Sequence, residues 1–469
     1  MSFTSSVFLF VFFPLSVLGY FLIRKELNNF YLLLISIFFY AYGDLKSIPI
    51  LLSSVLINCI LGICIEKAGS NSKKMVFCLT LGLIYNIGQL FVVKYLIFTV
   101  NNINQLLNFN IVISDILLPM GISFFTFKAV SYLVDIFMGK YPAQKNLVDF
   151  ALYISFFPQI MSGPIVRYND FHKDLAERRV SLEGMSHGIA RFITGLAKKL
   201  ILSNSFAIVA DKAFAVVGTS ELSICLSWLG AICYTLQIYY DFSGYSDMAI
   251  GIGNLFGFRC RENFDYPYIS KSVSEFWRRW HISLGTWFKD YVYFPLGGSR
   301  VKTKGRLFFN LFAVWFLTGV WHGANWTFIV WGMFYLVILA FEKFLGYPEK
   351  LKRRGSRIIY QIFTLICVMV GWVIFRSSDV KAAGAYLMSM LGLRNNLMIN
   401  GLDLFLIRDN AILLILGVLF SMPVIDRLRS RTSKRCLKPV AWSVLILLFL
   451  VCISYSVNVS YNPFIYFNF

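Results

Sequence analysis

Apolar runs separated by short basic segments make up most of this chain. Many of these runs extend for about 20 residues, the length that an α-helix needs to cross the hydrocarbon core of a bilayer. We count about eleven such runs, and we expect some shorter apolar pieces to re-enter the membrane without crossing it. The pattern therefore predicts an all-α polytopic membrane protein, with re-entrant or interfacial helices in addition to its transmembrane helices.

The first apolar run, from Met1 to Ile23, predicts a membrane helix rather than a cleaved signal peptide. It lacks a basic n-region and an A-x-A cleavage site, and the first positive charges, Arg24 and Lys25, follow it. Because cytoplasmic loops are enriched in Lys and Arg, this order of charges predicts an extracytoplasmic amino terminus.

The carboxy-terminal part predicts three further spans, near 359–376, 410–425 and 440–458. Two basic segments flank the first two spans, and an uncharged tail follows the third, which gives a consistent in–out–in–out alternation. The first basic segment contains Lys350, Lys352, Arg353, Arg354 and Arg357, and the second contains Arg427, Arg429, Arg431, Lys434 and Arg435.

The middle of the chain follows a different pattern. Residues 167–199 mix basic, acidic and apolar residues at helical spacing, which predicts a cytoplasmic pair of interfacial helices with His172 and His187 on the solvated surface. Residues 261–300 are too polar to span and unusually aromatic for a loop. We expect this second segment either to lie along the membrane interface or to line a cavity enclosed by protein.

Composition agrees with a membrane protein and excludes several other classes. Of the 469 residues 58% are hydrophobic and 14% are charged, so the chain has too few polar residues to cover a soluble domain. The net charge of +20 reflects basic loops between the spans, and no basic–aromatic pattern predicts nucleic-acid binding. The nine cysteines form no CxxC pair, so we expect neither a disulfide framework nor a metal site.

One histidine, His322, lies inside an apolar stretch, and the spacing around it predicts a hairpin. Only 36 residues lie between Arg306 and Lys343, both of which belong to basic stretches, so two crossings leave room for only a short turn. Gly319 and Gly323 fall where this hairpin should turn or break, which places His322 near its apex. This spacing fits two roles for His322 equally well. It is either an ionisable group that takes part in chemistry or a core histidine that is hydrogen-bonded to a neighbouring helix.

A series of motifs over residues 119–326 resembles one family. The motifs are PMGISFFTF at 119–127, FPQ at 157–159, SGPI at 162–165, YDFSGYSD at 240–247, NF at 263–264, PY at 267–268, FWRRWHISL at 276–284 and TGVWHGA at 318–324. In this order they resemble the bacterial membrane-bound O-acyltransferases (MBOAT) of the alginate O-acetyltransferase type. The resemblance implies one integral membrane domain over 1–469, with a motif-bearing core at 119–345 and additional spans within 359–458.

The resemblance also implies an arrangement and a site. Helices surround a central tunnel, the essential membrane histidine of the family corresponds to His322, and the second recurrent histidine corresponds to His281. Acyl transfer from a thioester to a hydroxyl needs a base or a nucleophile that carries the acyl group, and imidazole can act as either. For His281 we expect either an assisting or a structural role.

Neighbouring residues provide candidates for binding donor and substrate. Fixed donors must stabilise the developing oxyanion, and Trp280, Trp321, Asn325 and the amides beside Gly323 are candidates by their proximity in the sequence.

Four charged residues near these candidates have two readings each. Arg278 and Arg279 either bind the phosphates of coenzyme A or anchor the segment at the cytoplasmic face. Asp241 and Asp247 either line the pore or, as we favour, pair with Arg or hydroxyl groups to hold helices together.

The predicted function is O-acetylation of an extracytoplasmic cell-envelope or secreted polysaccharide. By this resemblance the protein lies in the cell (inner) membrane and passes acetyl groups from a cytoplasmic thioester, acetyl-CoA, to an extracytoplasmic acetyltransferase partner. No permanently bound cofactor is expected. The alternatives are D-alanyl transfer from a carrier protein towards teichoic acid, a non-catalytic transporter of the acyl donor, and an inactive scaffold for the partner enzyme. No internal repeat of the kind common in transporters is visible in the sequence.

Overall fold

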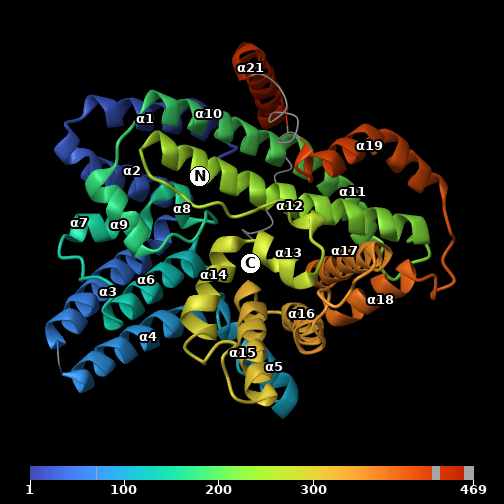
Figure 1. Cartoon of the computed structure of the whole chain (residues 1–469), viewed down its shortest axis with the longest axis horizontal. Coiled ribbons are helices and arrows are strands. Elements are labelled where there is room, and N and C mark those ends of the chain that lie inside the picture. Colours follow the sequence, from blue (N-terminus) through green and yellow to red (C-terminus); the bar gives the residue numbers. More distant parts are fainter. Residues whose placement is uncertain (70, 425–433, 459–469) are drawn as a thin grey trace. The chain divides into compact units, whose positions relative to one another are not determined.

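The computed structural model describes residues 1–69, 71–424 and 434–458 (Figure 1). All regular structure in these ranges is helical, which confirms the all-α prediction. The helices form two compact units, which are Met1–Phe192 with Tyr245–Arg261 and Ile193–Gly244 with Glu262–Phe469. A single integral domain over 1–469 stays a prediction.

The first unit contains the amino-terminal helices. They are α1 (Phe13–Leu22), α2 (Asn28–Gly43), α3 (Ile48–Ala68), α4 (Ser72–Lys94), α5 (Leu96–Leu107), α6 (Ile122–Phe137), α7 (Leu147–Ser155), α8 (Phe157–Ile160) and α9 (Tyr168–Glu177). Two helices, α10 (Leu182–Ala197) and α12 (Ile224–Leu255), contribute residues to both units.

The second unit contains both candidate histidines. Its helices are α11 (Asn204–Ala215), α13 (Val273–Arg279), α14 (Ile282–Phe288), α15 (Lys304–His322), α16 (Trp326–Leu345), α17 (Arg354–Arg376), α18 (Val380–Met390), α19 (Gly401–Phe420) and α21 (Lys434–Asn458).

Within the described ranges, six helical segments are long and apolar enough to cross a membrane. They are Leu45–Ala68, Ser72–Lys94, Leu182–Ala215, Trp326–Leu345, Arg354–Arg376 and Pro439–Val457. The run at Met1–Ile23 forms a shorter apolar helical segment, Phe8–Leu22. A total of about eleven spans stays a prediction, as do the central tunnel and the position of the amino terminus.

The carboxy-terminal spans agree with prediction at two of three places. Helices α17 and α21 cover the spans expected near 359–376 and 440–458. The segment expected to span at 410–425 instead forms the later part of α19, which starts at Gly401 with a reciprocal capping box of Asn400 and Asp403 and is not among the six candidate spans. Helix α18 was not predicted. Residues Arg427, Arg429, Arg431, the tail 463–469 and the side chains of Lys434, Arg435 and Cys436 lie outside the described residues.

The segment 167–199 is only partly as predicted. Two helices, α9 and α10, do form, and His172 and His187 are exposed. However, α10 does not stop at an interface but continues through a π-helical turn, Lys198–Ser203, into α11. This turn directs Lys199 into the protein, where only 1% of the residue is exposed. Lys199 is therefore a core residue and not part of an interfacial basic surface.

Helices α15 and α16 pack closely because glycines, which have no side chain, lie where the two backbones approach each other. A Cβ atom on Gly319 would lie 2.6 Å from the carbonyl oxygen of Phe328, and one on Gly332 would lie 2.5 Å from that of Trp315. Gly319 therefore allows α15 to pack closely against α16. It does not form the turn of the hairpin, although its position in the sequence predicted that it would turn or break the chain there.

Candidate functional site

The predicted hairpin around His322 is confirmed. Helix α15 ends at His322, α16 starts at Trp326, and only Gly323, Ala324 and Asn325 connect them. Asn325 shapes this turn, because its Oδ1 accepts a hydrogen bond from Thr327 N at 3.0 Å and its Nδ2 donates to the carbonyl oxygen of Ser378 at 2.9 Å. The Asn325 amide thus caps α16 and fixes the turn.

The imidazole of His322 lies in a shell of aromatic rings. The residue is 5% exposed. Its ring centroid lies 4.9 Å from that of Trp331 and 5.0 Å from that of Phe375, and both pairs are nearly perpendicular. The ring centroid of Trp321 lies 4.8 Å from that of His322. An imidazole in such a shell is shielded from bulk water. This shielding strengthens its electrostatic interaction with any charge that develops beside it.

His281 lies at the junction of two short helices, α13 and α14. The region 261–300 does not span, in agreement with prediction, and consists of short helical pieces and loops. The backbone of His281 is left-handed, with φ at 45°, and the residue is 2% exposed. A left-handed conformation at a residue other than glycine has an energetic cost, so the surrounding contacts must hold it.

Asn263 provides these contacts. Its Oδ1 lies 3.1 Å from His281 Nδ1 and also accepts hydrogen bonds from the main-chain N–H and the hydroxyl of Ser283, at 3.1 and 2.9 Å. Its main-chain oxygen accepts the N–H of Ile282 at 2.9 Å. Asn263 therefore satisfies the first N–H groups of α14 in place of a local cap. In the sequence Asn263 appears only as part of the NF motif, and nothing around it predicts this role.

Aromatic rings connect the segments that carry the two histidines. The indole of Trp321 lies 4.8 Å from the ring of His322 and 6.2 Å from the ring of His281. Trp277 of α13 packs at 5.4 Å on Trp331, which in turn contacts His322. The structure thus brings the two predicted histidines and Trp321 into one aromatic cluster.

Trp280, another predicted site residue, belongs to the packed core of the second unit. It is 2% exposed, and its ring lies 4.8 Å from Trp372 and 5.0 Å from Phe264.

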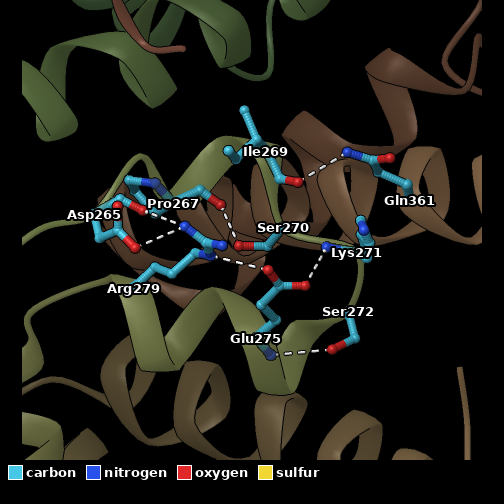
Figure 2. Close-up of polar contacts among 9 residues, drawn as sticks. All are labelled: Asp265, Pro267, Ile269, Ser270, Lys271, Ser272, Glu275, Arg279 and Gln361. Carbon is cyan, nitrogen blue, oxygen red and sulfur yellow. Dashed lines mark hydrogen bonds and ion pairs between the residues drawn. The ribbon is translucent and has the colours of Figure 1, made fainter. Parts of the chain in front are cut away.

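The two arginines of the FWRRWH motif have different environments. Arg279 donates from Nε to Glu275 at 2.9 Å and from a terminal nitrogen to the Asp265 carboxylate at 2.8 Å (Figure 2). Its charge is already compensated by these two acids. Arg278 is exposed and forms no ion pair with any residue that the structure describes. Of the two, Arg278 is thus the cation that can bind an added anion.

Figure 2 shows how the loop before α13 is fixed. Gln361 of α17 donates to the carbonyl oxygen of Ile269 at 2.9 Å, and Glu275 accepts the N–H of Lys271 at 2.9 Å. The hydroxyl of Ser272 caps α13 by accepting the N–H of Glu275 at 3.0 Å. Polar contacts to α17 and within the start of α13 therefore fix the segment that leads to His281.

A residue without any predicted role, Glu342, connects α16 with α13. Its two carboxylate oxygens accept the N–H groups of Val273 and Ser274, each at 2.8 Å, and Tyr360 donates to it at 3.1 Å. In the sequence it stands beside Lys343, as an ordinary surface pair would, so nothing local indicates this role.

Asp241 forms a buried ion pair. Its Oδ1 lies 2.5 Å from Lys199 Nζ, and the two side chains are 0% and 2% exposed. Asp247, in the first unit, pairs with Arg191 at 2.8 Å. Both carboxylates thus connect helices, the role favoured for them above, although the cation beside Asp241 is a lysine and not an Arg; the expected hydroxyl contact comes from Ser203, at 3.5 Å. In the described part of the chain, no three His, Cys, Asp or Glu residues come close enough to share a metal ion.

Comparison with known proteins places this arrangement in a family. The model of the membrane-bound O-acyltransferase family (MBOAT) matches residues 140–377, a range that contains both histidines. The chain belongs to the MBOAT family. This MBOAT protein is 42% identical over 387 residues to the probable alginate O-acetylase AlgI of Azotobacter vinelandii, an alignment that covers 82% of this chain and 76% of the relative.

Two further relatives act on cell-wall polymers. Over 83% of this chain and 80% of the relative, the MBOAT protein is 33% identical to the peptidoglycan O-acetyltransferase of Helicobacter pylori. The teichoic acid D-alanyltransferase of Bacillus subtilis is 32% identical over 55% of this chain and 68% of the relative. Together with the apolar helices, these matches identify the protein as a multi-pass membrane O-acyltransferase.

Proposed function

We propose that this O-acyltransferase takes an acetyl group from cytoplasmic acetyl-CoA and passes it across the cell (inner) membrane for O-acetylation of an extracytoplasmic polysaccharide. The AlgI-type and peptidoglycan O-acetyltransferase relatives support the acetyl group and the glycan. The observation that carries the proposal is the pair of buried imidazoles, His322 and His281, both in ring contact with Trp321.

Two routes use His322 differently. In the first, His322 removes the proton of the acceptor hydroxyl, whose oxygen attacks the thioester carbon, and the departing thiolate takes the proton. In the second, a nitrogen of His322 attacks the thioester carbon and expels the thiolate, which takes the proton of the ring. The acetyl group then passes from His322 to the hydroxyl oxygen, and the proton of the hydroxyl finally returns to the His322 ring. Both routes need a site free of bulk water, because hydrolysis of the thioester would otherwise compete.

Arg278 is the proposed contact for the phosphates of the donor. It is exposed, lies three residues before His281 and forms no ion pair in the described part of the chain. Guanidinium groups bind phosphate oxygens in a bidentate fashion, which suits the nucleotide end of coenzyme A. The acetyl group is then passed to an extracytoplasmic acetyltransferase partner.

The experiment is incubation of the purified protein with radiolabelled acetyl-CoA, wild type beside His322→Ala. Label retained on the wild-type chain and absent from the variant supports the covalent route. Label that appears only in released or transferred product, and still requires His322, supports the base route. Equal transfer by a folded His322→Ala protein would show that His322 is not catalytic.

The second candidate function is D-alanyl transfer from a carrier protein, which the Bacillus subtilis relative supports. If the wild type and His322→Ala both fail to transfer acetyl groups even with partner proteins added, the same assay with a D-alanyl-loaded carrier protein tests this alternative. Absence of transfer from both donors would favour a transporter of the acyl donor.

A further inference from the structure

The contacts of Asn263 determine which nitrogen of His281 carries a proton. A main-chain N–H can only donate, so the Asn263 atom that faces Ser283 N at 3.1 Å must be the amide oxygen. The same oxygen faces His281 Nδ1 at 3.1 Å. Because that oxygen can only accept, Nδ1 must donate, and the lone pair of the neutral ring lies on Nε2.

The ring of His281 is neutral in this environment. The residue lies outside the six candidate membrane spans, and burial lowers the pKa of its imidazole below the ordinary value. A neutral imidazole has one donor and one acceptor nitrogen, so fixing Nδ1–H also fixes Nε2 as the acceptor.

The basic nitrogen is buried and unused by the protein. Among the described residues, none forms a hydrogen bond with Nε2 of His281. A buried polar atom without a partner is uncommon and points to a ligand or a reacting group. The ring cannot easily turn away, since Asn263 also holds the backbone on its carboxyl side through Ile282 and Ser283.

We propose that Asn263 is a positioning residue that holds His281 as the Nδ1–H tautomer, so that Nε2 receives the proton of the acceptor hydroxyl. This inference rests on the proposed O-acetyl transfer. In the transfer step the hydroxyl oxygen forms the new bond to the acetyl carbon while its proton moves to Nε2. This step belongs to the covalent route, so the bond that breaks is the one between that carbon and a nitrogen of His322. The departing atom then takes the proton from His281, which restores the neutral ring.

The direct test is nitrogen NMR of protein labelled with ¹⁵N-histidine, without any donor. The chain has four histidines, and the spectrum of His281→Gln identifies the signals of His281 by their loss. We expect a protonated Nδ1 and an unprotonated Nε2 in the wild type. A wild-type spectrum with the proton on Nε2 would overturn the inference, whatever any variant does.

Variants connect the tautomer to the reaction. In Asn263→Ala we expect the proton to redistribute to Nε2, with kcat lower by about 10²-fold, the contribution of a general base, and KM little changed. The matched control is Asn400→Ala, which removes another capping asparagine of the same unit that does not contact a histidine. It should change neither the tautomer nor kcat.

Two outcomes separate this inference from the proposed function. A folded Asn263→Ala protein that keeps the Nδ1–H tautomer would show that Asn263 has only a structural role. If Asn263→Ala does not fold, Ser283→Ala, which retains the main-chain donor, should keep the wild-type tautomer. A wild-type protein with the expected spectrum but without acetyl transfer would overturn the proposed function and leave the assignment of the tautomer unaffected.

Discussion

Oε1 of Glu342, on α16, lies 2.8 Å from the main-chain nitrogen of Val273, the first residue of α13. The other carboxylate oxygen accepts the next N–H group, at Ser274. Glu342, from the hairpin that carries His322, therefore accepts the first two N–H groups of α13, the helix that leads to His281. A carboxylate is favourable at the amino-terminal end of a helix. The positions of the two histidine segments depend on each other through this contact.

Removal of this carboxylate should weaken both the fold and the site. Glu342→Ala leaves one buried and one partly buried N–H group and one tyrosine hydroxyl without their acceptor, so we expect a loss of about 3 kcal/mol in unfolding free energy. Thermal unfolding in detergent and acetyl transfer should both be measured. Glu349→Gln is the control, because Glu349 is an exposed acid in the loop after α16. An unchanged melting temperature for Glu342→Ala would contradict this role.

The two neighbouring arginines should behave differently when substituted. Arg278→Ala should raise the Kd for acetyl-CoA several-fold with little effect on thermal stability, since the side chain is exposed. Arg279→Ala should lower thermal stability, because Glu275 and Asp265 lose their shared cation. Isothermal titration and a melting curve for each variant test both statements, and an unchanged donor affinity for Arg278→Ala would exclude the phosphate contact.

The Lys199–Asp241 pair should be costly to break but not costly to replace. Lys199→Met alone removes the cation beside the buried carboxylate of Asp241, with an expected loss of about 3–5 kcal/mol. The double variant with Asp241→Leu should recover most of that loss, since well-packed apolar residues often replace a buried ion pair without penalty. Chemical unfolding of the single and double variants measures the recovery. A stable double variant that no longer binds acetyl-CoA would instead place Asp241 in the donor site.

Close packing at Gly319 should be required for the hairpin. In Gly319→Ala the added methyl group would overlap the Phe328 carbonyl, so the helices must separate, at a cost of about 1–3 kcal/mol. Gly305→Ala is a matched control in the same helix, because an added Cβ there meets nothing within 4 Å. The control should be neutral or slightly stabilising in thermal unfolding. Equal melting temperatures for the two variants would argue against close packing as the function of Gly319.

Spacing along the chain predicted the hairpin well. The number of residues between Arg306 and Lys343 placed His322 near the apex, and α15 does end at that residue. The same reasoning could not identify Glu342, whose partner Val273 is 69 residues away, or the role of Asn263, which lies 18 residues from His281. These contacts form only when separate segments fold together, so neither hydrophobic period nor charge order reveals them.

Charge order also misled the prediction at Lys199. A lysine next to other basic residues is typical of a cytoplasmic surface. At this position, however, the π-helical turn Lys198–Ser203 changes the direction in which the side chain points, and Asp241 receives it in the core. Sequence periodicity assumes one helical pitch throughout, so it cannot indicate such a turn.

The π-helical turn makes the protein sensitive to chain length at this point. A π-helical turn contains more residues than an α-helical one, so deletion of one residue between 198 and 203 would allow a regular α-helix to form. The helical residues on either side would keep their register, because the deleted residue is the extra one of the π-helical turn, but side chains within the turn, such as Lys199, would change direction. Asp241 would lose its cation although every functional residue type was still present. The number of residues in this turn, and not only their identity, therefore determines whether Lys199 reaches Asp241.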